Sequence, residues 1–191
     1  MTALLTAVLA FVALAGCTGN QTGGNPTTAP PTGGEQTSSQ PTSEASGPKL
    51  DIAKFVSAPC SILTASQIST LGAVRTAEPG TSALGPNCTW DGQDPIKNST
   101  YEISVTTGKD FDAMNENSKK NGVFVDKTID GVRVISTDGT DASMYCLTSI
   151  QASKTDSVTV QISTASDERG TKKPCPETER VAQLIITNLK G

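Results

Sequence analysis

The chain has 191 residues, with 15 basic and 19 acidic side chains, a net charge of −4 and no histidine. The lack of histidine excludes Ser–His and Cys–His catalysis and histidine-ligated zinc, because each of them needs an imidazole. A mildly acidic chain without a cluster of Lys and Arg also argues against nucleic acid as a partner, since phosphate backbones are bound by concentrated cations. At this length we expect one domain with a tail.

The chain opens on an apolar run, ALLTAVLAFVALA, over residues 3–15. Thirteen helical residues would cover about 20 Å, which is short of the roughly 30 Å hydrocarbon core of a membrane. This length is typical of the apolar region of a signal peptide, although the first three residues, MTA, lack the usual basic residue. We therefore predict that residues 1–16 are a signal peptide, and the motif that follows indicates the lipoprotein type.

Leu14–Cys17, LAGC, follows directly and resembles the lipobox of bacterial lipoproteins. The resemblance implies that a diacylglycerol is attached to the Cys17 thiol, and that the peptidase then cuts before this residue. Several acyl chains anchor a protein stably, because each buried methylene contributes about 0.8 kcal/mol. We expect a cell-membrane location on the extracytoplasmic side. The alternative is an unmodified cysteine in a leader.

Residues 17–48 are expected to be the lipidated cysteine and a disordered tether. From Thr18 to Pro48, 22 of the 31 residues are Gly, Thr, Pro or Ser, without apolar periodicity. Such a segment buries too little apolar surface to offset the entropy of ordering. Residues 49–191 contain all 15 basic and 17 of the 19 acidic residues, so their net charge is −2. We predict that they form a single folded domain.

Local patterns predict helices and strands throughout this domain. A capping box begins the first helix, apolar alternation marks the strands, and Asp130-Gly131 fits a two-residue hairpin turn. Short strands with helices between and after them indicate an α+β fold, an antiparallel sheet of about five to six strands with helices packed on one face. The expected helices span residues 65–71, 110–120 and 177–190, and the expected strands span 88–90, 101–107, 123–129, 132–137, 144–152 and 158–164.

Once Cys17 is assigned to lipid, Cys60, Cys88, Cys146 and Cys175 remain as an even set. An extracytoplasmic location favours disulfides, and three pairings are possible. We favour Cys60–Cys88 and Cys146–Cys175, each of which closes a loop of about 30 residues worth roughly 3.5 kcal/mol. Free buried thiols and a metal site are weaker alternatives, since no C-x-x-C pair is present.

With these residues placed, the domain resembles a family of actinobacterial lipoproteins with a domain of unknown function. The resemblance covers about residues 55–190. It implies an actinobacterial cell-envelope location and supports the favoured disulfide pairing, but implies no activity. The residues that carry it are the PCSILT segment 59–64, the CTW segment 88–90, the DGV segment 130–132, Cys146 and Cys175.

Candidate catalytic groups are few. The acidic pairs Asp110 with Asp112 and Asp138 with Asp141 are interpreted as helix-start charges and turn formers. Trp90 and Tyr145 are expected to pack in the core rather than to stack on a ligand. We predict no cofactor, no metal and no catalytic residue.

The expected function is a non-catalytic binding or sensing domain in the cell envelope, anchored to the membrane through Cys17. Its partner is an envelope ligand or protein that the sequence does not identify. The alternatives are a histidine-free hydrolase that uses paired carboxylates, and a structural accessory of a secretion complex.

Overall fold

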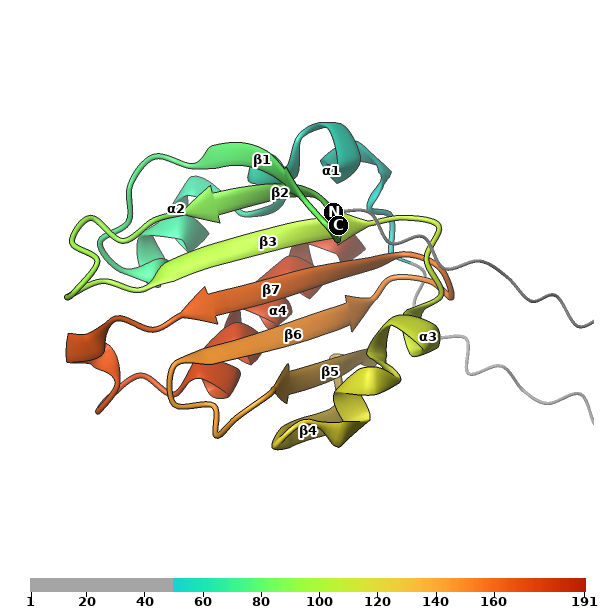
Figure 1. Cartoon of the computed structure of the whole chain (residues 1–191). Helices are drawn as coiled ribbons and strands as arrows, with labels where there is room; N and C mark the ends of the chain where they lie inside the picture. The colour runs from blue at the N-terminus through green and yellow to red at the C-terminus, as the bar shows by residue number, and fades with distance from the viewer. Residues whose placement is uncertain (1–49) are drawn as a thin grey trace, which may run out of the picture. The chain divides into compact units, whose positions relative to one another are not determined.

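The structure, a computed structural model, describes residues 50–191 (Figure 1). The expected signal peptide, lipidated Cys17 and tether lie outside the described residues. Seven strands form one sheet in the order β1-β2-β3-β7-β6-β5-β4, and every neighbouring pair is antiparallel. The strands are β1 Glu78–Ser82, β2 Gly85–Trp90, β3 Thr100–Thr106, β4 Val123–Ile129, β5 Val132–Asp138, β6 Tyr145–Gln151 and β7 Ser157–Ser163.

Within residues 50–191, four α-helices and four 3-10 turns accompany the sheet. The last helix, α4, is the longest and packs on β5, β6 and β7, behind the sheet in Figure 1. Among the described residues, no helix combines the length and the apolar character needed to cross a membrane. The helical elements are α1 Ala53–Ser57, η1 Pro59–Ile62, α2 Ala65–Ile68, η2 Ser69–Leu71, α3 Phe111–Asn115, η3 Asn117–Lys120, η4 Ser166–Glu168 and α4 Pro174–Lys190.

The core lies between α4 and one face of the sheet. Alternate residues of the central strands point toward the helix, as the two-residue period of a strand requires. Leu50 and Ile52 are each 4% exposed and join this core at the first described residues. Fully buried members of the core include Trp90, Tyr101, Ile103, Val105, Val158, Val160, Ile162, Ile185 and Ile186.

The antiparallel α+β architecture agrees with the sequence prediction, but the sheet has seven strands rather than five or six. The additional strand is β1, whose sequence EPGTS contains Pro79 and Gly80. Both residue types are depleted in strands, and proline is tolerated at a sheet edge because no ladder hydrogen bond is lost there. β1 is an edge strand paired only with β2, so pairing rather than propensity defines it.

The predicted helix 110–120 is broken, and it lies on the other face of the sheet. Asp110 caps α3 by accepting a hydrogen bond from the Ala113 N–H at 2.9 Å. The Asn115 side chain donates to the Phe111 carbonyl at 2.8 Å and competes with the helix for that acceptor. A 3-10 turn follows. Arg133 of β5 points away from the α4 side and contacts this segment, so the expected placement of all helices on one face is wrong.

The other predicted elements agree with the structure to within a few residues. The capping box at Thr64 and Gln67 begins α2. Asp130 and Gly131 both have positive φ, 48° and 78°, as a type I′ turn between β4 and β5 requires. The last helix begins at Pro174 instead of residue 177, because prolines are compatible with a first turn whose N–H groups have no helical acceptor.

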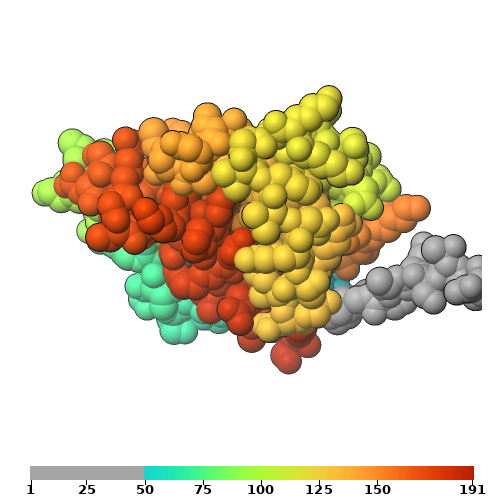
Figure 2. All heavy atoms as spheres, turned by 90° about the horizontal axis from the view of Figure 1, so that it is seen from below, coloured from blue at the N-terminus to red at the C-terminus, as the bar shows by residue number. Residues whose placement is uncertain are grey.

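Two disulfides connect the helical elements to the sheet, with the pairing that the sequence favoured. Cys60–Cys88 joins η1 to β2 with Cα atoms 5.0 Å apart, and Cys146–Cys175 joins β6 to the first turn of α4 with Cα atoms 5.1 Å apart. Seen from the β4 edge, α4 lies beside the β4–β5 hairpin (Figure 2), where Lys127 forms an ion pair with Glu179 of the helix.

Replacing Cys146 and Cys175 together by serine is expected to lower the free energy of unfolding by about 3.5 kcal/mol, because a loop of about 30 residues becomes open in the unfolded chain. Urea denaturation under non-reducing conditions measures this loss. The Cys60→Ser/Cys88→Ser variant is the matched comparison, because its sequence separation is 28 against 29. A loss below about 1 kcal/mol in both variants would contradict the entropic origin.

Candidate functional site

An open hollow of about 500 Å³ lies at the N-terminal end of α4. Its lining comes from the first turns of the helix and from the segment before it, which is orange-red in Figure 1. Three of its six residues are cations and one is a carboxylate. The lining residues are Thr171, Lys172, Lys173, Pro176, Glu177 and Arg180.

Tyr101 of β3 connects the hollow to the core. Its ring is completely buried, and its hydroxyl donates to Glu177 Oε1 at 2.8 Å while accepting from Lys172 Nζ at 3.2 Å. Burial, together with the negative charge of Glu177, raises the pKa of the Tyr101 hydroxyl. The hydroxyl therefore stays protonated and acts as a fixed donor to the carboxylate.

Arg180 and Glu177 form a two-pronged ion pair one turn apart on α4. Arg180 Nε and Nη2 donate to the two Glu177 carboxylate oxygens at 3.0 and 2.7 Å. The same guanidinium reaches η2, where it donates to the Thr70 hydroxyl and carbonyl at 3.1 and 3.2 Å. Burial alone would raise the pKa of Glu177, but hydrogen bonds from Arg180 and Tyr101 outweigh it and lower the pKa below its ordinary value.

Glu168 secures the segment that leads into the hollow. Its Oε1 forms an ion pair with Lys172 at 2.8 Å, and its Oε2 accepts hydrogen bonds from the Ser99 hydroxyl and N–H. Burial raises the pKa of Glu168, but the hydrogen bonds from Lys172 and Ser99 prevail and lower it. The two carboxylates, Glu168 and Glu177, thus hold Lys172, Tyr101 and Arg180 in place.

The charge of the hollow differs from that of the whole chain. The lining carries Lys172, Lys173 and Arg180 against Glu177 alone, in a protein of net charge −4. In the sequence only the adjacent Lys172-Lys173 pair signals this group. Arg180 is brought to this group by α4 and Tyr101 is brought there by β3. The site was therefore not predicted from the sequence.

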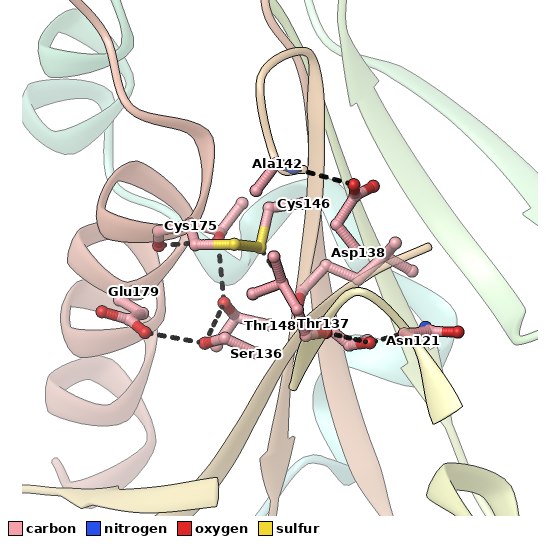
Figure 3. Close-up of a disulfide and its surroundings, with 12 residues drawn as sticks. Asn121, Ser136, Thr137, Asp138, Ala142, Cys146, Thr148, Cys175 and Glu179 are labelled. Carbon is pink, nitrogen blue, oxygen red and sulfur yellow. Dashed lines mark hydrogen bonds between the residues drawn. A yellow bond between two sulfur atoms is a disulfide. The ribbon is translucent and has the colours of Figure 1, made fainter. Parts of the chain in front are cut away.

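The acidic pairs considered as catalytic candidates hold local structure instead. Asp110 caps α3, while Asp112 forms an ion pair with Arg133 at 2.7 Å. Asp138 Oδ2 accepts from the Thr140 hydroxyl and from the N–H groups of Thr140 and Ala142, which closes the loop after β5 (Figure 3). Asp141 Oδ1 accepts from the Ser143 N–H at 3.0 Å. These contacts agree with their interpretation as helix-start and turn residues.

A chain of hydroxyl groups lies beside the Cys146–Cys175 disulfide (Figure 3). Ser136 Oγ donates to Glu179 Oε1 at 2.8 Å and lies 2.9 Å from Thr148 Oγ1, which lies 2.7 Å from Thr178 Oγ1. Thr178 donates to the Cys175 carbonyl at 3.0 Å. The hydroxyl groups therefore satisfy one another between α4 and the sheet, as buried polar groups must.

The sheet face opposite α4 is polar and carries an exposed aromatic ring. Tyr145 is 43% exposed there, so the expectation that it packs in the core is wrong, whereas Trp90 is completely buried as expected. Strand alternation explains the difference: Cys146, the neighbour of Tyr145, points into the core, so Tyr145 points away. The cross-strand partner of Tyr145 is Ser163, which in turn pairs with Thr100, and the next row on the same face is Leu147, Gln161, Glu102 and Thr89.

Within residues 50–191, no group of three or more Cys, Asp or Glu side chains is placed to hold a metal ion. Cys60, Cys88, Cys146 and Cys175 are all engaged in disulfides. Cys17, the expected site of lipid attachment, lies outside the described part of the chain.

Fold and site together define a disulfide-bonded α+β domain with a cationic hollow at the start of its last helix. The chain belongs to the family described as Protein of unknown function (DUF3558), whose family model matches residues 12–188. Searches of curated proteins and of solved structures gave no match.

Two partly buried carboxylates, Glu177 in the hollow and Glu168 beside it, predict a loss of stability in acid. Because the pKa values of Glu168 and Glu177 are lowered from 4.5 in the folded protein, their contribution is present above that pH and is lost as the pH falls through the lower folded values. Glu177→Gln should reduce the free energy of unfolding at pH 7 by about 1–2 kcal/mol and flatten its decline between pH 5 and 3. Urea titrations across this range measure both effects.

Glu116→Gln serves as the control, since the Glu116 side chain is 64% exposed in its ion pair with Lys119. We expect it to change the free energy of unfolding by less than about 0.5 kcal/mol. An unchanged acid profile in Glu177→Gln and in Glu168→Gln would show that these contacts do not stabilise the fold.

Proposed function

We propose that this protein is a lipid-anchored lipoprotein of the actinobacterial cell envelope, whose domain binds an envelope component without catalysing a reaction. The lipid-anchor part of this proposal is supported by the pairing of the other cysteines. Four of the five cysteines pair with one another, and since a cysteine forms one disulfide, none of them is available to Cys17. The remaining thiol follows an apolar run within the lipobox-like LAGC motif, where a diacylglycerol is the fitting partner.

The disulfides support an extracytoplasmic location. Disulfides persist in oxidising surroundings and are rare where cellular thiol reductants keep cysteines reduced. Both bridges close loops within the domain and connect a helical element to the sheet, which suits a domain that works outside the cytoplasm. The tether expected over residues 18–48 would then separate this domain from the membrane surface.

A binding role is better supported than hydrolysis by the state of the carboxylates. Glu177 is held by Arg180 and Tyr101, and Glu168 by Lys172 and Ser99. General acid catalysis needs a carboxyl group with a raised pKa, whereas the pKa values of these two are lowered. The hollow is thus a rigid charged surface suited to recognition.

Cys17→Ser is expected to abolish lipid attachment. In a bacterial host with the lipoprotein pathway, the wild-type chain should incorporate labelled palmitate and sediment with membranes, and the variant should do neither. Thr18→Ser is the matched control, because it leaves the thiol in place and should be labelled like the wild type. Labelling that persists in Cys17→Ser would contradict the assignment.

The binding role is tested by a photo-crosslinking residue placed at Pro176, inside the hollow, in cells that carry the anchored protein. We expect a discrete crosslinked product there and none with the same residue at Lys120, on η3. Identical patterns at the two positions, or no product at Pro176, would argue against a binding surface in the hollow.

A further inference from the structure

We propose that the hollow at the start of α4 binds a phosphate group of an envelope component, with Lys173 and Lys172 as its ligands and Arg180 as a fixed background charge. This inference rests on the proposed binding function and deepens it by naming the chemistry of the ligand. The hollow, its three cations and the engagement of its one carboxylate are the observations that carry it.

Lys173 is the principal ligand. Its side chain lines the hollow, is exposed, and has no hydrogen-bond or ion-pair partner within residues 50–191. An ammonium group has three donors, all of which are available at this position. Lys173 is also the N-cap residue of α4, so its backbone is fixed by the start of a 17-residue helix.

Lys172 supplies a second, oriented ammonium. Two of its three donors are used, by Glu168 Oε1 at 2.8 Å and by the Tyr101 hydroxyl at 3.2 Å. One donor remains for a ligand. Because the side chain is only 19% exposed and held from two sides, little conformational entropy is lost when an anion binds.

Arg180 contributes charge rather than hydrogen bonds. Of its five N–H donors, two already bind the Glu177 carboxylate and two bind Thr70, which leaves a single Nη1–H. The guanidinium fork, which can bind a carboxylate or a phosphate with two donors, is therefore already occupied by Glu177. Most of the donors left in the hollow belong to the ammonium groups of Lys172 and Lys173, which act as point charges and can bind phosphate.

The test uses residues 18–191, which contain both disulfides and the whole described core and therefore fold without the leader. Tripolyphosphate is titrated into the labelled protein at low ionic strength and followed by amide NMR shifts. We expect shifts centred on residues 171–180 that weaken as salt is added. Lys173→Gln should weaken binding at least about tenfold, because the ligand with the most free donors is removed.

Lys120→Gln is the matched control. The Lys119-Lys120 pair repeats the arrangement of Lys172-Lys173, since Lys119 pairs with Glu116 and Lys120 has no partner within the described domain. Lys120 does not line the hollow, so this variant should bind like the wild type. Equal weakening in both variants, or shifts outside residues 171–180, would overturn the proposal. Within residues 50–191 the Lys173 side chain has no hydrogen bond or ion pair to lose, so Lys173→Gln is expected to fold like the wild type.

Two further arms identify the source of the phosphate and its preference over carboxylate. A lipid headgroup is supported if the protein binds vesicles of phosphatidylglycerol with phosphatidylcholine but not vesicles of phosphatidylcholine alone. Lys173→Gln should then lose this vesicle binding. Binding to tripolyphosphate without vesicle binding would support a phosphate on a soluble or wall polymer. No binding in either arm, or equal affinity for tricarballylate, would overturn the phosphate assignment, while a crosslink at Pro176 would still support the binding function.

Discussion

The packing of α4 against β5, β6 and β7 is the interaction on which the rest of the structure depends. The helix buries Val181, Ala182, Ile185 and Ile186 against the inward-facing residues of the sheet. The Cys146–Cys175 disulfide fixes the start of the helix on β6, and the Lys127–Glu179 ion pair ties it to the edge strand β4. The axial position of α4 on the sheet is thereby set by covalent, apolar and charged contacts together.

The hollow exists because that position is fixed. α4 carries Glu177 and Arg180, the sheet presents Tyr101, and the segment before the helix brings Lys172. A slide of the helix by one turn, about 5.4 Å, would separate Glu177 from the Tyr101 hydroxyl and leave a buried donor unpaired. The charged network therefore forms only at this position of the helix. The free energy gained by burying apolar side chains in the core offsets the cost of desolvating the carboxylates of the network.

Local sequence patterns were sufficient wherever the deciding residues are neighbours in the chain. The Asp130-Gly131 turn, the Thr64 cap and the alternating strands β3, β5 and β7 are of this kind. The disulfide pairing was favoured among three possible ones, with support from the family resemblance, and the structure has that pairing. β1 was not predicted, because Pro79 and Gly80 hide a strand that only its pairing with β2 defines.

The placement of α3 and the hollow needed three-dimensional information. α3 lies opposite α4 because Arg133 contacts Asp112 and Asp126 at 2.7 and 2.8 Å and its guanidinium lies 5.5 Å from the centre of the Phe111 ring. Nothing in the local pattern of residues 110–120 selects one face of a sheet. The polar network beside the hollow joins Ser99, Tyr101, Glu168 and Arg180, which come from separate parts of the chain, so it forms only when the sheet and α4 meet.

Under the proposed lipid anchor, the burial of Leu50 and Ile52 has a mechanical consequence for the domain. A pull on the preceding segment reaches the core at Leu50, and it can peel away only the residues up to Cys60. At that point the Cys60–Cys88 bridge passes the load directly to β2, which is hydrogen-bonded on both sides within the sheet. Residues 61–87, including the edge strand β1, are bypassed. The load therefore enters the sheet at β2, a strand held by hydrogen bonds to β1 and to β3.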